Sequence, residues 1–169
     1  MIRLLGGTLV AAGAAWMGFR ASAALKARAR ALGEMGEGLA LLEQELELDS
    51  PPMPLLMDRL ILRSRGPAKK LFQDCGRALD RLSEEEFSLA WRRLAGELEE
   101  LGEEGRQALM PLGEVLGRCS CREERQGVEG VRRRLETLRD RTEEEYRRQG
   151  RVYQTLGLSG GAFLVILLM

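Results

Sequence analysis

The sequence contains no histidine among its 169 residues, and this absence excludes whole classes of chemistry. Without an imidazole there is no Ser–His–Asp triad, no histidine acid–base catalysis and no histidine-containing zinc site. Cysteine is also scarce. Three residues are too few for a disulfide scaffold, and their odd number favours a reducing compartment. No Gly-Lys dipeptide occurs, so the chain cannot contain the phosphate-binding loop G-x-x-x-x-G-K-[ST].

A net charge is missing as well, because 26 basic side chains balance 26 acidic ones. This balance removes the usual electrostatic case for nucleic-acid binding, and we expect no nucleic-acid partner. The charges are unevenly placed: segments 4–19 and 152–169 carry none, and apart from Arg3 every charged residue lies between Arg20 and Arg151. The chain therefore has two apolar ends and a highly charged middle.

The C-terminal segment 152–169 predicts a transmembrane helix. Its 18 uncharged residues would span about 27 Å as a helix, close to the roughly 30 Å hydrocarbon core of a bilayer. Tyr153 lies at the charged edge, where an amphipathic ring is favoured. The alternative is a buried core helix, but residues 164–169 are all apolar and carry no polar cap. We therefore assign 152–169 to the membrane.

The N-terminal segment 4–19 predicts a second span, so that residues 1–24 form an N-terminal transmembrane helix. Its 16 residues become long enough if Arg3 and Arg20 extend toward the headgroups. The alternative is a cleaved signal peptide, with Ala21-Ser22-Ala23 as an A-x-A cleavage site. Arg20 directly before these small residues, and the unbroken helical pattern after them, favour the span.

Basic residues follow the first span and precede the second. They are Arg20, Lys26, Arg28, Arg30, Arg147, Arg148 and Arg151. Basic residues that flank a membrane span stay on the cytoplasmic side of the membrane. We therefore predict a double-pass protein with the middle segment in the cytoplasm and both termini outside. Small residues at four-residue spacing suggest that the two spans pack together, although glycine and alanine are common in membrane helices anyway. These residues are Gly7, Ala11, Ala15, Gly157 and Gly161.

The middle segment, residues 25–151, reads as an all-α bundle of about five or six helices without strands. Its clearest apolar stripes are Leu32, Met35, Leu39, Leu42 and Leu46, then Phe87, Trp91, Leu94, Leu98 and Leu101. Ser50 is the expected N-cap of a helix with Pro51 at its first position. Ser83 and Glu86 are expected to form a capping box. The last helix is expected to start near Arg122 and to run toward the C-terminus.

No constellation for catalysis, a cofactor or a metal emerges, and we expect no enzymatic activity. Cys119-Ser120-Cys121 offers two ligands where a metal site needs about four, and we interpret it as a loop. Charge distribution is more informative: residues 31–58 hold seven acids and no base, and residues 83–104 hold eight acids against two arginines. An acidic bundle surface under a basic juxtamembrane collar would suit a basic cytoplasmic partner and anionic lipid, although any single glutamate is more simply a solvated side chain.

Three stretches of the chain resemble the stage III sporulation protein AB family of endospore-forming bacteria. They are the opening MIRLLGGTLVAAGAAWMGF, the central LGEVLG at 112–117 and the closing YQTLGLSGGAFLVILLM. The resemblance extends over essentially the whole chain. It implies a place in the eight-protein machinery of the mother cell that, with a forespore protein, forms a channel across the two membranes around the forespore. The expected location is the outer forespore membrane.

The resemblance also implies a partner. The family's cytoplasmic domain is similar to the F platform proteins of type II secretion and type IV pilus systems, whose six-helix bundles dock a hexameric ATPase. The implied partner here is stage III sporulation protein AA, the machinery's ATPase. F proteins usually have two bundles and three spans, so the single bundle suggests self-association or completion by another membrane protein of the set. The alternative function is a secreted or surface-anchored helical domain with a cleaved signal peptide.

Overall fold

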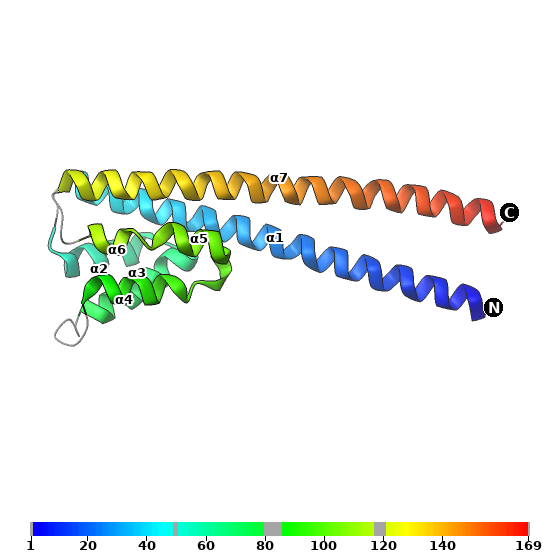
Figure 1. Ribbon diagram of the computed structural model, residues 1–169, viewed down its shortest axis with the longest axis horizontal. Helices are drawn as coiled ribbons and strands as arrows, with labels where there is room; N and C mark the ends of the chain where they lie inside the picture. Colours follow the sequence, from blue (N-terminus) through cyan, green and yellow to red (C-terminus); the bar gives the residue numbers. More distant parts are fainter. Residues whose placement is uncertain (1, 49–50, 80–85, 117–120, 169) are drawn as a thin grey trace. The chain divides into compact units, whose positions relative to one another are not determined.

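A computed structural model describes the backbone of residues 2–48, 51–79, 86–116 and 121–168. Side chains are described for residue 20 and for 22–48, 51–79, 86–116 and 122–148. Every regular element within these ranges is helical, so the all-α class is confirmed. The elements are α1 (Ile2–Leu48), α2 (Met53–Arg63), α3 (Gly66–Leu79), α4 (Phe87–Gly96), the 3₁₀ helix η1 (Glu99–Leu101), α5 (Gly102–Leu109), α6 (Leu112–Val115) and α7 (Cys121–Leu168) (Figure 1).

The chain divides into two compact units. One unit is Arg28–Asp140, and the other joins Met1–Ala27 with Arg141–Met169. Arg28–Asp140 contains the hydrophobic core, in which every buried member lies between Ala31 and Leu138. We call this unit the bundle below.

Two long helices meet along the bundle in an antiparallel pair. The fully or nearly buried residues of α1 recur in steps of three and four, at Leu32, Met35, Leu39, Leu42 and Leu46. Those of α7 do the same at Val128, Val131, Leu135 and Leu138. This is the spacing of a coiled-coil seam. Ion pairs flank the seam, with Arg125 at 2.9 Å from Glu47 and Arg132 at 3.2 Å from Glu43.

Two predicted helix starts are wrong. α2 begins at Met53 with Pro54 in its first turn, not at Pro51, and Ser50 lies outside the described residues. Glu86 is itself the N-cap of α4, with an extended backbone at φ −66° and ψ 137°, so it cannot be the third helical residue of a capping box. Ser83 lies outside the described residues.

The stripe from Phe87 to Leu101 is buried or partly buried as predicted, but it does not belong to one helix. α4 ends at Gly96, and Gly102 has a φ of +68°, a value that favours glycine and begins a new direction of the chain. Pro111 lies between α5 and α6, which is consistent with the clash that a proline inside a helix makes with the preceding turn. These breaks explain why the described chain has more helices than predicted.

Within the part of the chain whose residues are described, no helix is long and apolar enough to cross a membrane. The two segments predicted as spans, 4–19 and 152–169, have a helical backbone in α1 and α7, but their side chains lie outside the described residues. The same holds for the predicted packing residues Gly7, Ala11, Ala15, Gly157 and Gly161.

Candidate docking surface

Three of the seven acids predicted to form an acidic face at residues 31–58 are paired within the fold. Glu43 and Glu47 pair with arginines of α7, as described above. Glu45 is buried, with its carboxylate 3.0 Å from Arg59 and 2.9 Å from Arg63 of α2. These three carboxylates therefore hold α2 and α7 against α1, and they are not free to meet a partner.

The Glu45 pair is a structural feature and not a binding site. Only 8% of the glutamate side chain is exposed, whereas Arg59 and Arg63 are 40% and 47% exposed. Two guanidinium groups thus cover one buried carboxylate and reach water with their outer edges. Such an arrangement compensates the cost of burying the charge, and removing both arginines would leave it uncompensated.

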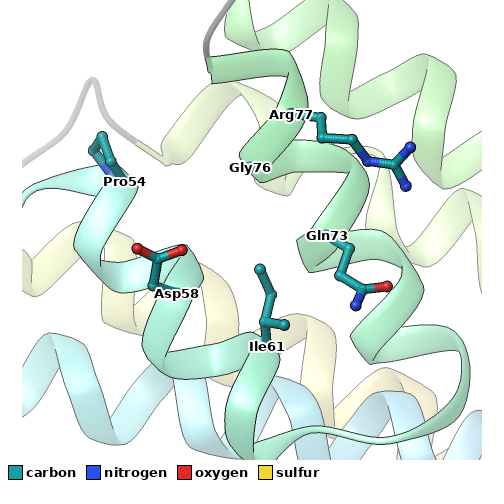
Figure 2. A pocket seen from close by; sticks show the side chains of 6 residues that line it. All are labelled: Pro54, Asp58, Ile61, Gln73, Gly76 and Arg77. Carbon is teal, nitrogen blue, oxygen red and sulfur yellow. The ribbon is translucent and has the colours of Figure 1, made fainter.

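A groove lies between α2 and α3 and has a volume of about 520 Å³. Figure 2 shows Asp58 and Ile61 of α2 projecting toward α3, while Gln73 and Arg77 of α3 extend away from α2. Arg77 is paired with Asp74 at 2.6 Å, but Asp58 is exposed and has no ion-pair partner among the described residues. The groove thus combines an apolar wall with one free carboxylate.

The outer face of α2 beside this groove is unusually apolar. Leu55 is 45% exposed and Leu62 is 83% exposed, although neighbouring positions on the same helix are buried in the core. Exposed large apolar residues that lie close to a groove are typical of surfaces that meet another protein. Apolar spacing alone does not distinguish this exposed side of α2 from a buried one.

A basic corner, which was not predicted from the sequence, joins α2 to α3. We define it as Arg65, Lys69 and Lys70, which are all exposed and have no acidic partner among the described side chains. Glu34 of α1 lies close to this corner, with its carboxylate against Gly66. Gly66 has a φ of +51°, a conformation that favours glycine and directs the chain from α2 into α3. A run from Arg59 to Gln73 with five bases and no acid was the available signal.

The second predicted acidic segment, 83–104, is exposed where it is described. We define the acidic turn as Glu97, Glu99, Glu100, Glu103 and Glu104, which connect α4, η1 and α5 and are all exposed. Arg93 lies 3.8 Å from Glu97, and Glu103 pairs with Arg106. The hydrogen bond that it accepts from Gln107 and its ion pair lower the pKa of the Glu103 carboxyl. Glu99, Glu100 and Glu104 keep an excess of negative charge.

Two arginines hold the acidic turn in place. Arg106 donates a hydrogen bond to the backbone carbonyl of Gly96 at 3.0 Å, which closes the turn on itself. Arg28 of α1 donates from Nε to the carbonyl of Leu101 at 3.2 Å, and its guanidinium occupies the space that a side chain at Gly102 would need. Arg28, one of the basic residues expected to follow the first span, thus connects the acidic turn to α1 within the bundle.

The cysteines are not brought together into a site. Cys75 is buried in the core, and Cys119 and the side chain of Cys121 lie outside the described residues. Burial raises the pKa of the Cys75 thiol to about 12, and the Asp74 carboxylate adds to this rise. Among the residues that the structure describes, no cluster of three cysteine or acidic side chains is suited to a metal ion.

Comparison with known proteins assigns the chain to a family. The model of the family described as "Stage III sporulation protein AB" matches residues 3–169, which is nearly the whole chain. The chain belongs to the stage III sporulation protein AB family. Family membership confirms the resemblance seen in the sequence and gives the protein a role in sporulation.

A solved structure of a stage III sporulation protein AB has the same fold as this chain. The two share 18% sequence identity with a TM-score of 0.62, and the match covers 72% of this chain and 97% of the other. No curated protein matches the sequence. The bundle of this family member is therefore an all-helical fold that another protein of the same description shares.

Proposed function

We propose that this family member is a non-enzymatic platform subunit of the mother cell-to-forespore channel. In this proposal, segments 4–19 and 152–169 anchor it in the outer forespore membrane, and the bundle lies in the mother-cell cytoplasm. There it couples the ATPase, stage III sporulation protein AA, to the other membrane proteins of the stage III set. The main support is the chain's charge pattern: its charges, apart from Arg3, are confined to 20–151, around a bundle that has its own core.

The groove between α2 and α3 is the proposed ATPase-docking surface. It lies on the helix whose outer face exposes Leu55, and it contains the carboxylate of Asp58, which pairs with none of the side chains that the structure describes. An apolar side chain and a basic side chain of a partner can be accommodated together on such a surface. Asp58 belongs to the acidic segment 31–58 of the sequence, whereas Glu43, Glu45 and Glu47 of that segment are already paired within the fold.

Changing this groove is expected to weaken ATPase binding at least tenfold. The variant Leu55→Glu with Asp58→Lys introduces a charge at the apolar position and reverses the free carboxylate, while both side chains are exposed and do not support the core. The measurement is the equilibrium binding of purified stage III sporulation protein AA to the full-length chain in detergent micelles. Glu37→Lys is the matched control, because Glu37 is exposed on α1 away from the groove. Equal loss in the control, or no binding by the unmodified chain, would contradict the proposed docking.

Topology can be tested with one engineered cysteine. Arg134 is exposed on α7, so Arg134→Cys in a Cys119→Ser, Cys121→Ser background provides a reporter in the bundle. A membrane-impermeant maleimide is expected to label this cysteine only after protoplasts are permeabilised. Cys75 is an internal control: maleimides react with the thiolate, and a buried thiol with a pKa of about 12 stays protonated at neutral pH until the protein is unfolded.

Labelling of the engineered cysteine on intact protoplasts would instead place the bundle outside. That result favours the alternative function, a secreted or surface-anchored helical domain that has lost its signal peptide. N-terminal sequencing of the mature protein separates the two independently. A mature chain that starts near Ala24 would contradict the N-terminal anchor, and one that retains residues 1–23 would support it.

A further inference from the structure

Two patches of opposite sign, the basic corner and the acidic turn, lie on the described surface of the bundle. The basic corner has three exposed cations, Arg65, Lys69 and Lys70, which have no acidic partner within the described part of the chain. The acidic turn has three exposed carboxylates without partners among the described side chains, namely Glu99, Glu100 and Glu104. A chain with zero net charge thus presents one strongly basic and one strongly acidic surface. The basic corner of one copy is therefore complementary in charge to the acidic turn of a second copy.

Both patches lie at nearly the same level along α1. The basic corner contacts α1 at Glu34, whose carboxylate lies against Gly66, the first residue of α3. The acidic turn contacts α1 at Arg28, through the hydrogen bond to Leu101 and the packing against Gly102. Residues 28 and 34 are six positions apart, which is about 9 Å of rise along a helix. Two parallel copies side by side can therefore bring the patches to similar heights.

The patches also face different directions around α1. Six residues at about 100° each turn the side chains of Arg28 and Glu34 about 120° apart. A contact from the basic corner of one copy to the acidic turn of the next leaves a free acidic turn and a free basic corner at the two ends of the pair. Such a head-to-tail contact continues to further copies, and it closes into a ring if the rotation allows.

An apolar side chain adjoins the basic corner. Leu62 is 83% exposed in the last turn of α2, three positions before Arg65. The aliphatic stems of glutamate side chains on the opposite surface offer apolar contact, while their carboxylates reach the surrounding cations. A charged contact with one apolar centre is typical of a moderate, salt-sensitive association.

We propose that the bundle self-associates head to tail, with Arg65, Lys69 and Lys70 of one copy binding Glu99, Glu100 and Glu104 of the next. The occupant of the basic corner is thus a second copy of this chain. This inference does not use the ATPase or the Asp58 groove, so it can fail while the proposed function stands; the two surfaces share only the outer face of α2. It gives a physical route by which a protein with one bundle assembles a multi-subunit surface.

Charge reversal tests the contact directly. Lys69→Glu with Lys70→Glu reverses the basic corner, and Glu100→Lys with Glu104→Lys reverses the acidic turn. Each double variant alone is expected to weaken self-association at least tenfold, because both of its patches then carry the same sign. Mixing the two variants is expected to restore association, since each reversed patch then meets its complement. The measurement is energy transfer between donor- and acceptor-labelled full-length chains in vesicles of neutral lipid.

The control is Arg122→Glu with Arg134→Glu, which changes the charge equally at exposed positions of α7 outside both patches. It is expected to associate like the unmodified chain, and raised salt is expected to weaken association of the unmodified chain. Loss in both reversed variants without restoration on mixing would overturn the proposal. So would full association of the Lys69→Glu, Lys70→Glu variant. If that variant instead loses only binding to vesicles of anionic lipid, the basic corner meets the membrane and the proposal is wrong.

Discussion

Replacing Trp91 with alanine is expected to lower the free energy of unfolding by about 3–5 kcal/mol, the usual cost of deleting a large aromatic side chain from a core. Trp91 is completely buried. Its indole nitrogen donates to the carbonyl of Leu109 at 2.9 Å, so it ties α4 to the end of α5. Phe87 lies with its ring centre 6.1 Å away, and Gly113 of α6 packs closely against the indole ring. One side chain thus connects three helices.

The loss would be a large part of the stability of a domain this size, which is about 5–15 kcal/mol in total. Trp91→Phe keeps most of the ring but removes the donor, and leaving a buried carbonyl unpaired costs about 1–3 kcal/mol. We therefore expect Phe to fall between the unmodified chain and Ala. The measurement is urea unfolding of the full-length protein in micelles, followed by far-ultraviolet circular dichroism.

Leu89→Ala is the matched control for this prediction, because Leu89 lies two residues away in α4 and is 54% exposed. It is expected to change stability by less than about 0.5 kcal/mol, as most surface substitutions do. A Trp91→Ala variant as stable as the Leu89→Ala variant would show that α4, α5 and α6 do not pack around the indole. The acidic turn follows α4 directly, so Trp91→Ala is also expected to weaken self-association.

The buried helix faces could be predicted from the sequence because a buried face requires apolar residues at a regular spacing. Leu32, Met35 and Leu39 recur at the spacing that places them on one helix face, and the structure buries all three. The same reasoning failed where backbone conformation breaks the period. The apolar stripe from Phe87 to Leu101 continues in space, but Gly96 and Gly102 end one helix and start another. The spacing of apolar residues gives no sign of these breaks.

The pairing of individual charged residues was harder to predict than the residues of the core. Residues 31–58 contain no base, so their acids looked free. Their partners come from α2 and α7, for example Arg125, which is 78 residues from Glu47 in the chain. Such pairs depend on which helices become neighbours, and a single sequence does not report that. The basic corner, in contrast, was visible as a run of bases without acids and needed no knowledge of the fold.

The same substitution, glycine to alanine, is expected to have opposite effects on stability at two positions of α1. A Cβ at Gly38 would overlap the Cβ of Ala68 in α3 and would lie 3.3 Å from Cε2 of Phe72. Gly36, two residues earlier, has nothing within 4 Å of its Cβ position. Gly36→Ala is therefore expected to stabilise the protein by up to about 1 kcal/mol, since alanine is the better helix former. Gly38→Ala is expected to destabilise it, because overpacking a core costs about 1–3 kcal/mol.

The difference between the two variants is thus expected to be about 1–4 kcal/mol, although the chemical change is identical. Urea unfolding can follow Trp91 fluorescence when Trp16→Phe removes the other tryptophan. Ala68→Gly provides a rescue: alone it weakens α3, but combined with Gly38→Ala it removes the overlapping methyl group. The pair should therefore show a favourable coupling of about 1 kcal/mol or more. Equal stabilities for Gly36→Ala and Gly38→Ala, or no coupling with Ala68→Gly, would mean that α1 and α3 do not touch at this crossing. Because the basic corner contacts α1 through Gly66 at the start of α3, a displaced α3 would also move the corner away from the level of the acidic turn.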